Sequence, residues 1–340
     1  MKIMVVTPCI YQLPLRGYGG LEKIAEDLIK GYLNAGHQVS VVAPEGSVLP
    51  EGAELIPMAL RESEESAYHK YSDQMADFDI VHDHTFEGWP YVASIGRNPQ
   101  LQVCHTFHTS PGIWSSPPPV PRPNMIGISQ NHSRSLAMQL GVPCKTVYNG
   151  SDTSFYSPPA KDKARNGRYL FMGRYTAEKG PLEAIQMAKK LRVPLDLYGD
   201  TEMVASQDYV DRCRNEADGL LVRYNQGISR SETVEVYQKY KALLFLPNWD
   251  EPHGLVLVEA QLCGLPVITL NRGSMSEVVK HGKSGFVCDT SEEVEDIIRN
   301  DKIDKIDPAA PRRWATRFST EKMTANYLSL FEEILDTGGW

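Results

Sequence analysis

Short apolar runs and amphipathic stripes alternate along the first half of the chain. An apolar run at 3–6 precedes apolar positions at helical spacing through 21–33, which Gly36 ends, and a second apolar run covers 37–44. Further strands are predicted at 79–84, 101–107, 124–129 and 144–150. Because short apolar strands that alternate with helices form parallel sheets covered on both faces, the pattern predicts an α/β domain.

The same alternation begins again after a polar, proline-containing segment at 152–167, which is the best linker candidate. Strands are predicted at 168–174, 194–200, 217–224, 241–247 and 265–270. The tail has one apolar helical face. We therefore predict two doubly wound, Rossmann-like domains, 1–152 and 153–318, and a C-terminal helix, 319–340, that packs back on the first. Two such sheets that face each other would hold a ligand in a central cleft, at the carboxyl ends of their strands.

Length and composition fit a globular protein of two domains, with 340 residues, 41% hydrophobic and 23% charged. A net charge of -8 argues against nucleic-acid binding and disfavours attachment to an anionic membrane. No apolar stretch approaches the roughly 20 residues of a membrane-spanning helix, and the first apolar run is too short for a signal peptide. The six cysteines are dispersed without a C-x-x-C pair, so we expect a reduced, cytoplasmic protein.

Two loops that follow predicted strands have the composition of anion sites. In "RGYGGLE", Gly17, Gly19 and Gly20 permit close backbone approach at the start of a helix, although a plain tight turn explains them equally well. In "FMGRYTAEKG", Arg174 and Lys179 flank the next helix start, where a diphosphate could be held. The alternative for the second loop is a solvated surface turn.

Four histidines lie near two predicted strand ends, namely His82, His84, His105 and His108. His82 and His84 point the same way by the two-residue period of a strand, so a metal site is one interpretation. Packed or hydrogen-bonded histidines are the commoner case, and no further ligand with convincing spacing supports zinc. The D-x-D sequence at 77–79 precedes its strand, which favours a structural role.

Two carboxylates bracket the apolar run 255–258 in the stretch from Asp250 to Thr269. We predict a helix from about His253 to Cys263, with Glu251 at its lip and Glu259 within it. Eight residues of helix would separate the carboxylates by roughly 12 Å along the axis. That distance is about the span between the sugar and the ribose of a nucleotide sugar, and carboxylates suit polyhydroxyl ligands because they accept hydroxyl hydrogen bonds.

The E-x7-E spacing resembles that of the retaining family 4 glycosyltransferases of the GT-B fold. The motifs around it, "AQLCGLPVIT" and "GSMSEVVKHGKSGFV", resemble that family too, as do "GYGGLE", "TFHTS", "GISQNHSR", "VYNGSDTSFY" and "GRYTAEKG". The likeness covers nearly the whole chain and is strongest to compact bacterial members. One departure is His253, because the family commonly has phenylalanine there, and this leaves the role of the histidine side chain open.

The resemblance implies a role for each matched residue. Glu259 would hold the ribose, Glu251 the transferred sugar, and Arg174 and Lys179 the leaving diphosphate, while His108 would lie by the reacting centre. The implied catalytic group is Arg174, Lys179, Glu251 and His108, and the implied donor-binding group is Glu259, Gly19, Gly20, Gly173, Gly199, His253, Gly254 and Leu255. The residues expected on the acceptor side are His84, Ser129 and Arg134, and those expected at the interdomain hinge are Asn149 and Asp152.

The resemblance implies transfer of a hexose, with retention, from a nucleotide diphosphate sugar to a hydroxyl of a small-molecule or glycan acceptor. UDP-glucose is the first donor to consider, and no cofactor or essential metal is expected. The proline-rich loop 114–123 either contacts the acceptor or only connects a strand to a helix. Other interpretations are a sugar-nucleotide epimerase or hydrolase on the same fold, a metal-dependent hydrolase built on the histidines, and a non-catalytic nucleotide-sugar-binding protein.

Overall fold

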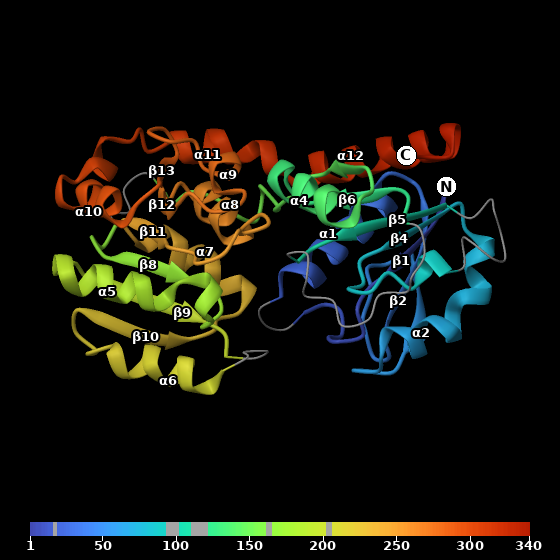
Figure 1. Cartoon of the computed structure of the whole chain (residues 1–340), viewed down its shortest axis with the longest axis horizontal. Helices are drawn as coiled ribbons and strands as arrows, with labels where there is room; N and C mark the ends of the chain where they lie inside the picture. The colour runs from blue at the N-terminus through green and yellow to red at the C-terminus, as the bar shows by residue number, and fades with distance from the viewer. Residues whose placement is uncertain (16–18, 93–101, 110–121, 161–164, 202–205) are drawn as a thin grey trace. The chain divides into compact units, whose positions relative to one another are not determined.

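The chain divides into two units, which are drawn in Figure 1. The structure is a computed structural model that describes residues 1–15, 19–92, 102–109, 122–160, 165–201 and 206–340. Unit 1 comprises Met1–Gly150 together with Thr320–Trp340, and unit 2 comprises Ser151–Ser319. The chain therefore passes between the units twice, after Gly150 and after Ser319.

Unit 1 contains a seven-stranded sheet in which every neighbouring pair is parallel, in the order β3-β2-β1-β4-β5-β6-β7. Its strands are β1 (Lys2–Val6), β2 (Gln38–Pro44), β3 (Ala53–Met58), β4 (Ile80–Asp83), β5 (Gln102–Phe107), β6 (Met125–Gly127) and β7 (Cys144–Thr146). The helices in its described residues are α1 (Gly20–Asn34), α2 (Glu64–Tyr71), the 3-10 helix η1 (Ser72–Asp77), α4 (Gln130–Leu140) and α12 (Thr320–Thr337). The strand order reverses between β1 and β4, which is where such sheets bind ligands at their carboxyl ends.

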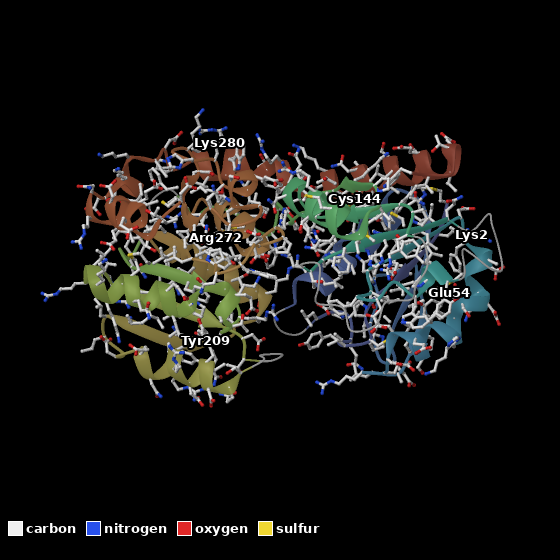
Figure 2. The ribbon with its side chains drawn as sticks, viewed as in Figure 1. Lys2, Glu54, Cys144, Tyr209, Arg272 and Lys280 are labelled. Atoms are coloured by element: carbon white, nitrogen blue, oxygen red, sulfur yellow. The ribbon has the colours of Figure 1, made fainter. Side chains whose placement is uncertain are left out.

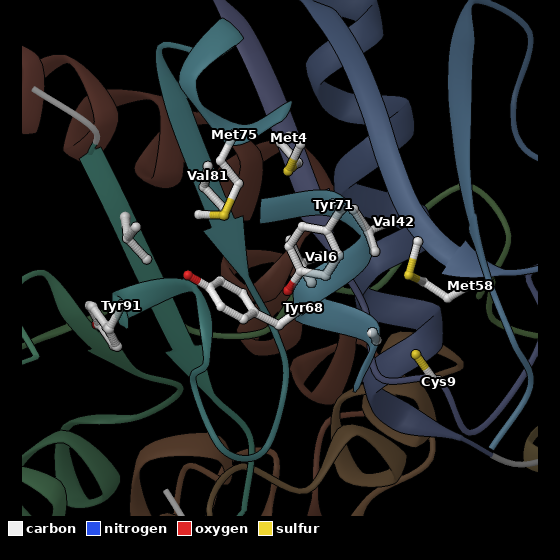
Figure 3. Packing of buried hydrophobic residues seen from close by; sticks show 12 residues of the cluster. Met4, Val6, Cys9, Val42, Met58, Tyr68, Tyr71, Met75, Val81 and Tyr91 are labelled. Atoms are coloured by element: carbon white, nitrogen blue, oxygen red, sulfur yellow. The ribbon is translucent and has the colours of Figure 1, made fainter. Parts of the chain in front are cut away.

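Side chains on β4 alternate between two different environments. Val81 packs with Met4 of β1 and with Tyr71 and Met75 from α2 and η1, in the cluster drawn in Figure 3. The neighbouring His82 faces the opposite way, where α1 and α12 also pack against each other. Helices therefore cover both faces of the sheet, as the apolar strands predicted.

Unit 2 contains a six-stranded parallel sheet in the order β10-β9-β8-β11-β12-β13. Its strands are β8 (Tyr169–Met172), β9 (Leu195–Gly199), β10 (Val222–Gln226), β11 (Ala242–Phe245), β12 (Val267–Leu270) and β13 (Gly285–Cys288). Its helices are η2 (Ala177–Lys179), α5 (Pro181–Leu191), α6 (Gln207–Glu216), α7 (Arg230–Lys239), α8 (Leu255–Leu262), α9 (Met275–Val278), α10 (Ser291–Arg299), η3 (Lys302–Lys305), α11 (Ala310–Ala315) and η4 (Thr316–Phe318). Every side chain of β8, β11 and β12 is buried, so the α/β prediction is confirmed here too. The order reverses between β8 and β11.

The helix after β11 starts later than the sequence predicts. Gly254, with φ of 77°, is the N-cap of α8, so Glu251 and His253 lie in the preceding loop. Because the segment from Glu251 to Gly254 is not helical, the rise of a helix does not determine the distance between Glu251 and Glu259. The 12 Å estimate assumed a continuous helix, and that assumption was wrong. The helix ends as predicted, because Gly264 follows its C-cap with φ of 71°.

Some elements have no clear pattern in the sequence. The edge strand β3 is mostly half-exposed, α2 has a weak apolar stripe, and the two central residues of the edge strand β13 are half-exposed. Within the described ranges, no helix combines the length and the apolar character needed to span a membrane.

Candidate functional site

A buried ion pair joins two loops of unit 2. The Lys179 ammonium lies 2.7 Å from Oε2 of Glu251, and the two side chains are only 10% and 7% exposed. Trp249 donates its indole N–H to the same oxygen at 2.9 Å, and the ammonium lies 4.5 Å from the centre of the Trp249 ring. Because Lys179 follows β8 and Glu251 follows β11, the pair lies where the strand order reverses.

Close backbone contact holds these two loops together. Gly180 has φ of 74°, and a Cβ there would lie 1.7 Å from the carbonyl oxygen of Leu246. The amide of Asn248 also donates to the Glu178 carbonyl at 3.0 Å. The position beside Lys179 therefore requires glycine.

A third segment, which follows β12 and contains Arg272 (Figure 2), orients the backbone of Glu251. The amide and the hydroxyl of Ser274 both donate to the Glu251 carbonyl at 2.9 Å, and the Gly273 amide donates to Asp250 Oδ1 at 3.0 Å. Spacing along the chain did not predict the contacts of Ser274 and Gly273, because they depend on which strands are neighbours.

Glu259 lies within α8 and is 7% exposed. The Tyr237 hydroxyl on α7 donates to Oε2 of Glu259 at 3.0 Å. Burial, and then the nearby Glu259 carboxylate, raise the pKa of Tyr237 well above its ordinary value. Tyr237 therefore stays protonated and acts as a fixed donor to Glu259.

The other basic residue expected at the diphosphate has a different environment. Arg174 is about one-third exposed, and a guanidinium nitrogen lies 3.6 Å from the Glu178 carboxylate. Two further glycines implied as donor-binding, Gly173 and Gly199, lie against each other, since a Cβ at Gly199 would come 2.4 Å from the Gly173 carbonyl oxygen. Both close the carboxyl ends of β8 and β9.

His253 is directed into unit 2. Its ring is 1% exposed and meets the Phe318 ring edge-to-face, with centroids 5.7 Å apart. The carbonyl of Phe318 accepts a hydrogen bond from the Ser151 amide at 2.9 Å, and Ser151 pairs with Ser319. His253 thus packs beside the residues at which the chain enters and leaves unit 2.

The four histidines expected near the two strand ends of unit 1 do not lie together. The rings of His82 and His84 lie 4.0 Å apart, and Nδ1 of His84 is 2.8 Å from Nε2 of His108. His105 faces the other side, with Nε2 3.0 Å from the Thr85 carbonyl oxygen. The hypothesis of one four-histidine metal cluster was therefore wrong. No three His, Cys, Asp or Glu side chains in the described parts of the chain are arranged to hold a metal ion.

The histidines near α1 and α12 are buried and neutral. His82 lies 3.0 Å from the Tyr32 hydroxyl through Nδ1 and 2.9 Å from Thr106 Oγ1 through Nε2. Burial, and then the neighbouring histidines, lower the pKa of both His82 and His84 well below the ordinary value. These rings form a polar layer within the hydrophobic packing.

The residues expected on the acceptor side have structural roles in the free protein. Ser129 is the N-cap of α4 and accepts from the His132 amide at 3.0 Å, and the Arg134 side chain donates to the Gln130 carbonyl at 3.3 Å. Gly19 is the N-cap of α1 and Gly20 its first residue. Gly17 and nearly all of the loop 114–123 lie outside the described residues.

The two residues expected at the hinge lie on either side of the first passage between the units. Asn149 is 4% exposed and belongs to unit 1. Asp152 opens unit 2, where Oδ1 accepts from the amides of Ser154 and Phe155 at 2.8 and 3.0 Å. These hydrogen bonds form a turn directly after Ser151 and lower the pKa of Asp152, against the opposing effect of burial, which is the largest single contribution.

Comparison with known families accounts for most of the chain. Residues 18–155 match the family described as Glycosyltransferase Family 4, and residues 157–310 match the family described as Glycosyl transferases group 1. Each half of the chain therefore matches a family of glycosyltransferase domains. Spore coat protein SA of Bacillus subtilis (strain 168) is 25% identical over 223 residues, which are 56% of this chain and 58% of that protein. The chain spans about half the length of the curated relatives it matches.

Two solved structures share the whole fold. AviGT4, a glycosyltransferase involved in avilamycin A biosynthesis, superposes with a TM-score of 0.76 at 21% identity and covers 100% of this chain and 99% of that one. HepE of Anabaena in complex with UDP-glucose superposes with a TM-score of 0.73 at 20% identity, covering 98% and 100%. Together with the two parallel sheets, these similarities confirm the predicted GT-B fold.

Proposed function

We propose that the protein transfers a hexose from a nucleotide diphosphate sugar to an acceptor hydroxyl, with retention at the anomeric carbon. The buried Lys179–Glu251 pair carries the proposal. Its two residues lie at the reversal of strand order, and Glu259 follows on the helix that starts after the Glu251 loop. A cation for phosphate and two carboxylates for hydroxyl groups match the chemistry of a nucleotide sugar.

UDP-glucose is the first donor to test. HepE, which shares the fold, is known in complex with UDP-glucose, with UDP, and with UDP and glucose. The proposed assignment has Glu259 holding the ribose hydroxyls, with its orientation maintained by Tyr237. Glu251 and the backbone at Gly254 and Leu255 would meet the hexose.

The proposed catalysis is electrostatic. In the free protein, Glu251 compensates the charge of Lys179, and a bound diphosphate would offer that ammonium a second anionic partner. Lys179 and Arg174 would stabilise the charge that develops on the diphosphate as it leaves, while His108 contacts the substrate. The acceptor would attack from the face that the diphosphate leaves, and the diphosphate would take the acceptor's proton. Losing one such contact typically costs about 2.7–4 kcal/mol of transition-state stabilisation.

We further propose that turnover needs no divalent metal, because Lys179 and Arg174 can neutralise the diphosphate. Activity in excess chelator tests this step, and complete loss that added magnesium or manganese restores would contradict it. A product analysis by proton NMR reports the anomeric configuration. An inverted product would contradict retention.

The deciding experiment is thermal unfolding in the presence of UDP-, GDP- and ADP-sugars. A ligand that binds the folded state raises the melting temperature, so the true donor should give the largest rise. The variant Lys179→Ala should lose most of that rise. The matched control is Lys189→Ala, because Lys189 pairs with Glu216 on the exposed surface of the same unit.

Turnover separates the proposed function from its alternatives. Nucleotide release that requires an acceptor supports a transferase. Release of free sugar or an epimer without an acceptor would instead indicate a hydrolase or epimerase, and a donor that binds without turnover in any acceptor panel would indicate a binding protein.

A further inference from the structure

His84 and His108 form a hydrogen-bonded pair of imidazole rings at the carboxyl ends of β4 and β5. His84 Nδ1 lies 2.8 Å from His108 Nε2, and the ring planes are inclined by 27°. His84 is fully buried, whereas His108 is half-buried. The geometry allows one proton between these two nitrogens, so one ring donates and the other accepts.

The ring of His84 has a fixed position. His82 packs against it at a centroid distance of 4.0 Å and is held through both of its own nitrogens, by the Tyr32 hydroxyl and Thr106 Oγ1. The amide of His84 continues the sheet by donating to the Val6 carbonyl at 2.9 Å. Burial lowers the pKa of His84 well below its ordinary value, so this ring is neutral and carries a single proton.

The second nitrogen of His84 indicates where that proton lies. Nε2 is buried and has no hydrogen-bond partner in the described part of the chain. If Nε2 carried the proton, a buried N–H donor would have no acceptor. If Nδ1 carries it, only an acceptor lone pair stays unpaired, and proteins leave buried acceptors unpaired more often than buried N–H donors.

We propose that His84 is a positioning residue that donates from Nδ1 to His108 and thereby holds His108 as its Nδ1–H tautomer. The role of this tautomer in transfer rests on the proposed function, but the tautomer itself does not. An unconstrained neutral histidine in water prefers the other tautomer, which carries its proton on Nε2. The hydrogen bond from His84 supplies the energy for the difference, since a typical hydrogen bond contributes about 0.5–1.5 kcal/mol.

The tautomer determines what His108 can do to a substrate. With Nε2 engaged as an acceptor, His108 presents an N–H at Nδ1. It then donates a hydrogen bond to a sugar hydroxyl or a phosphate oxygen and does not take the acceptor's proton. This agrees with a reaction in which the leaving diphosphate takes that proton.

Nitrogen-15 NMR of imidazole rings tests the proposal directly. A protein labelled at its histidines gives separate signals for protonated and unprotonated ring nitrogens, and the spectrum of His108→Gln identifies the His108 signals by their loss. At neutral pH we expect Nε2 of His108 to be unprotonated and Nδ1 to be protonated. A protonated Nε2, in either the neutral ring or the cation, would overturn the proposal whatever reaction the protein catalyses.

Two variants test the positioning role. In His84→Leu the donor is gone, so His108 should change to the Nε2–H form, and kcat should fall about 3- to 10-fold with the donor KM little changed. His84→Asn can still donate near the position of Nδ1 and should restore both. The control is His69→Leu, because His69 is exposed on α2.

An unchanged His108 tautomer in His84→Leu would refute the positioning role. If that variant does not fold, the wild-type spectrum still decides between the two proton arrangements. If no nucleotide sugar is turned over while the Nδ1–H form is observed, the proposed function fails and this inference stands.

Discussion

Replacing Lys179 by methionine should destabilise unit 2 far more than an ordinary lysine substitution does. The change leaves the Glu251 carboxylate, which is 7% exposed, without its cation. Removing one partner of a buried ion pair costs about 3–5 kcal/mol, because the remaining charge is uncompensated. For a domain of 150–250 residues, each kcal/mol lowers the melting temperature by roughly 2–4 °C, so a fall of roughly 6–20 °C is expected.

A double-mutant cycle isolates the pair from the individual side chains. Glu251→Gln alone should also destabilise, because it strands the buried Lys179 ammonium. The double variant Lys179→Met/Glu251→Gln leaves no charge uncompensated. Its loss of unfolding free energy should therefore be much smaller than the sum of the losses in the two single variants. The matched control pair is Lys189 and Glu216, whose side chains are 38% and 52% exposed, and its coupling should stay below about 1 kcal/mol.

Differential scanning calorimetry is the suitable assay, because it can resolve separate transitions of two units. The reasoning would be refuted if Lys179→Met lowered the melting temperature no more than Lys189→Met does. It would equally fail if the double variant were as unstable as the sum of the singles, since the charges would then not be coupled.

Three further outcomes follow from the structure. Tyr237→Phe removes the 3.0 Å hydrogen bond to Glu259 and should raise the donor KM roughly 2- to 10-fold with kcat little changed; steady-state kinetics with an unchanged KM would contradict this. Gly180→Ala would place a Cβ 1.7 Å from the Leu246 carbonyl oxygen, so the melting temperature should fall strongly. An unchanged melting temperature would contradict this, because it would mean that the loop moves to accept the methyl group. Burial raises the pKa of Glu64 from 4.5 to about 7, so the folded state holds a proton that the unfolded chain releases between these values. Stability should therefore fall as pH rises through that window, and the melting temperature of wild type relative to Glu64→Gln should fall with it; a difference independent of pH would contradict the shift.

The outcome for the histidines shows why strand placement matters more than composition. The period of two correctly predicted that His82 and His84 share a face. His105 lies within β5 and faces the other side, whereas His108 follows the end of β5 and lies beside His84, so the four histidines do not form a single cluster. Histidines that are close in the sequence therefore need not lie on the same face of the sheet.

The helix after β11 shows the limit of local signals. Proline and glycine predicted its two ends, and the glycine at the end was correct. The start was displaced because Gly254 adopts a left-handed conformation and becomes the N-cap. The loop that precedes it is held by Ser274 and Gly273 from another strand end, and no local pattern encodes a partner that far along the chain.

The sequence by itself determined that two parallel α/β sheets form. The period of apolar positions is a local property, so it can be read from neighbouring residues without knowing which residues make contact. It also indicated which loops follow strands and carry charge. Only the tertiary structure decided that Lys179 and Glu251 meet, that Tyr237 holds Glu259, and that the His84 ring contacts His108. These pairs join residues 22 to 72 positions apart, and strand order and helix packing, which arise from long-range burial, bring them within hydrogen-bonding distance.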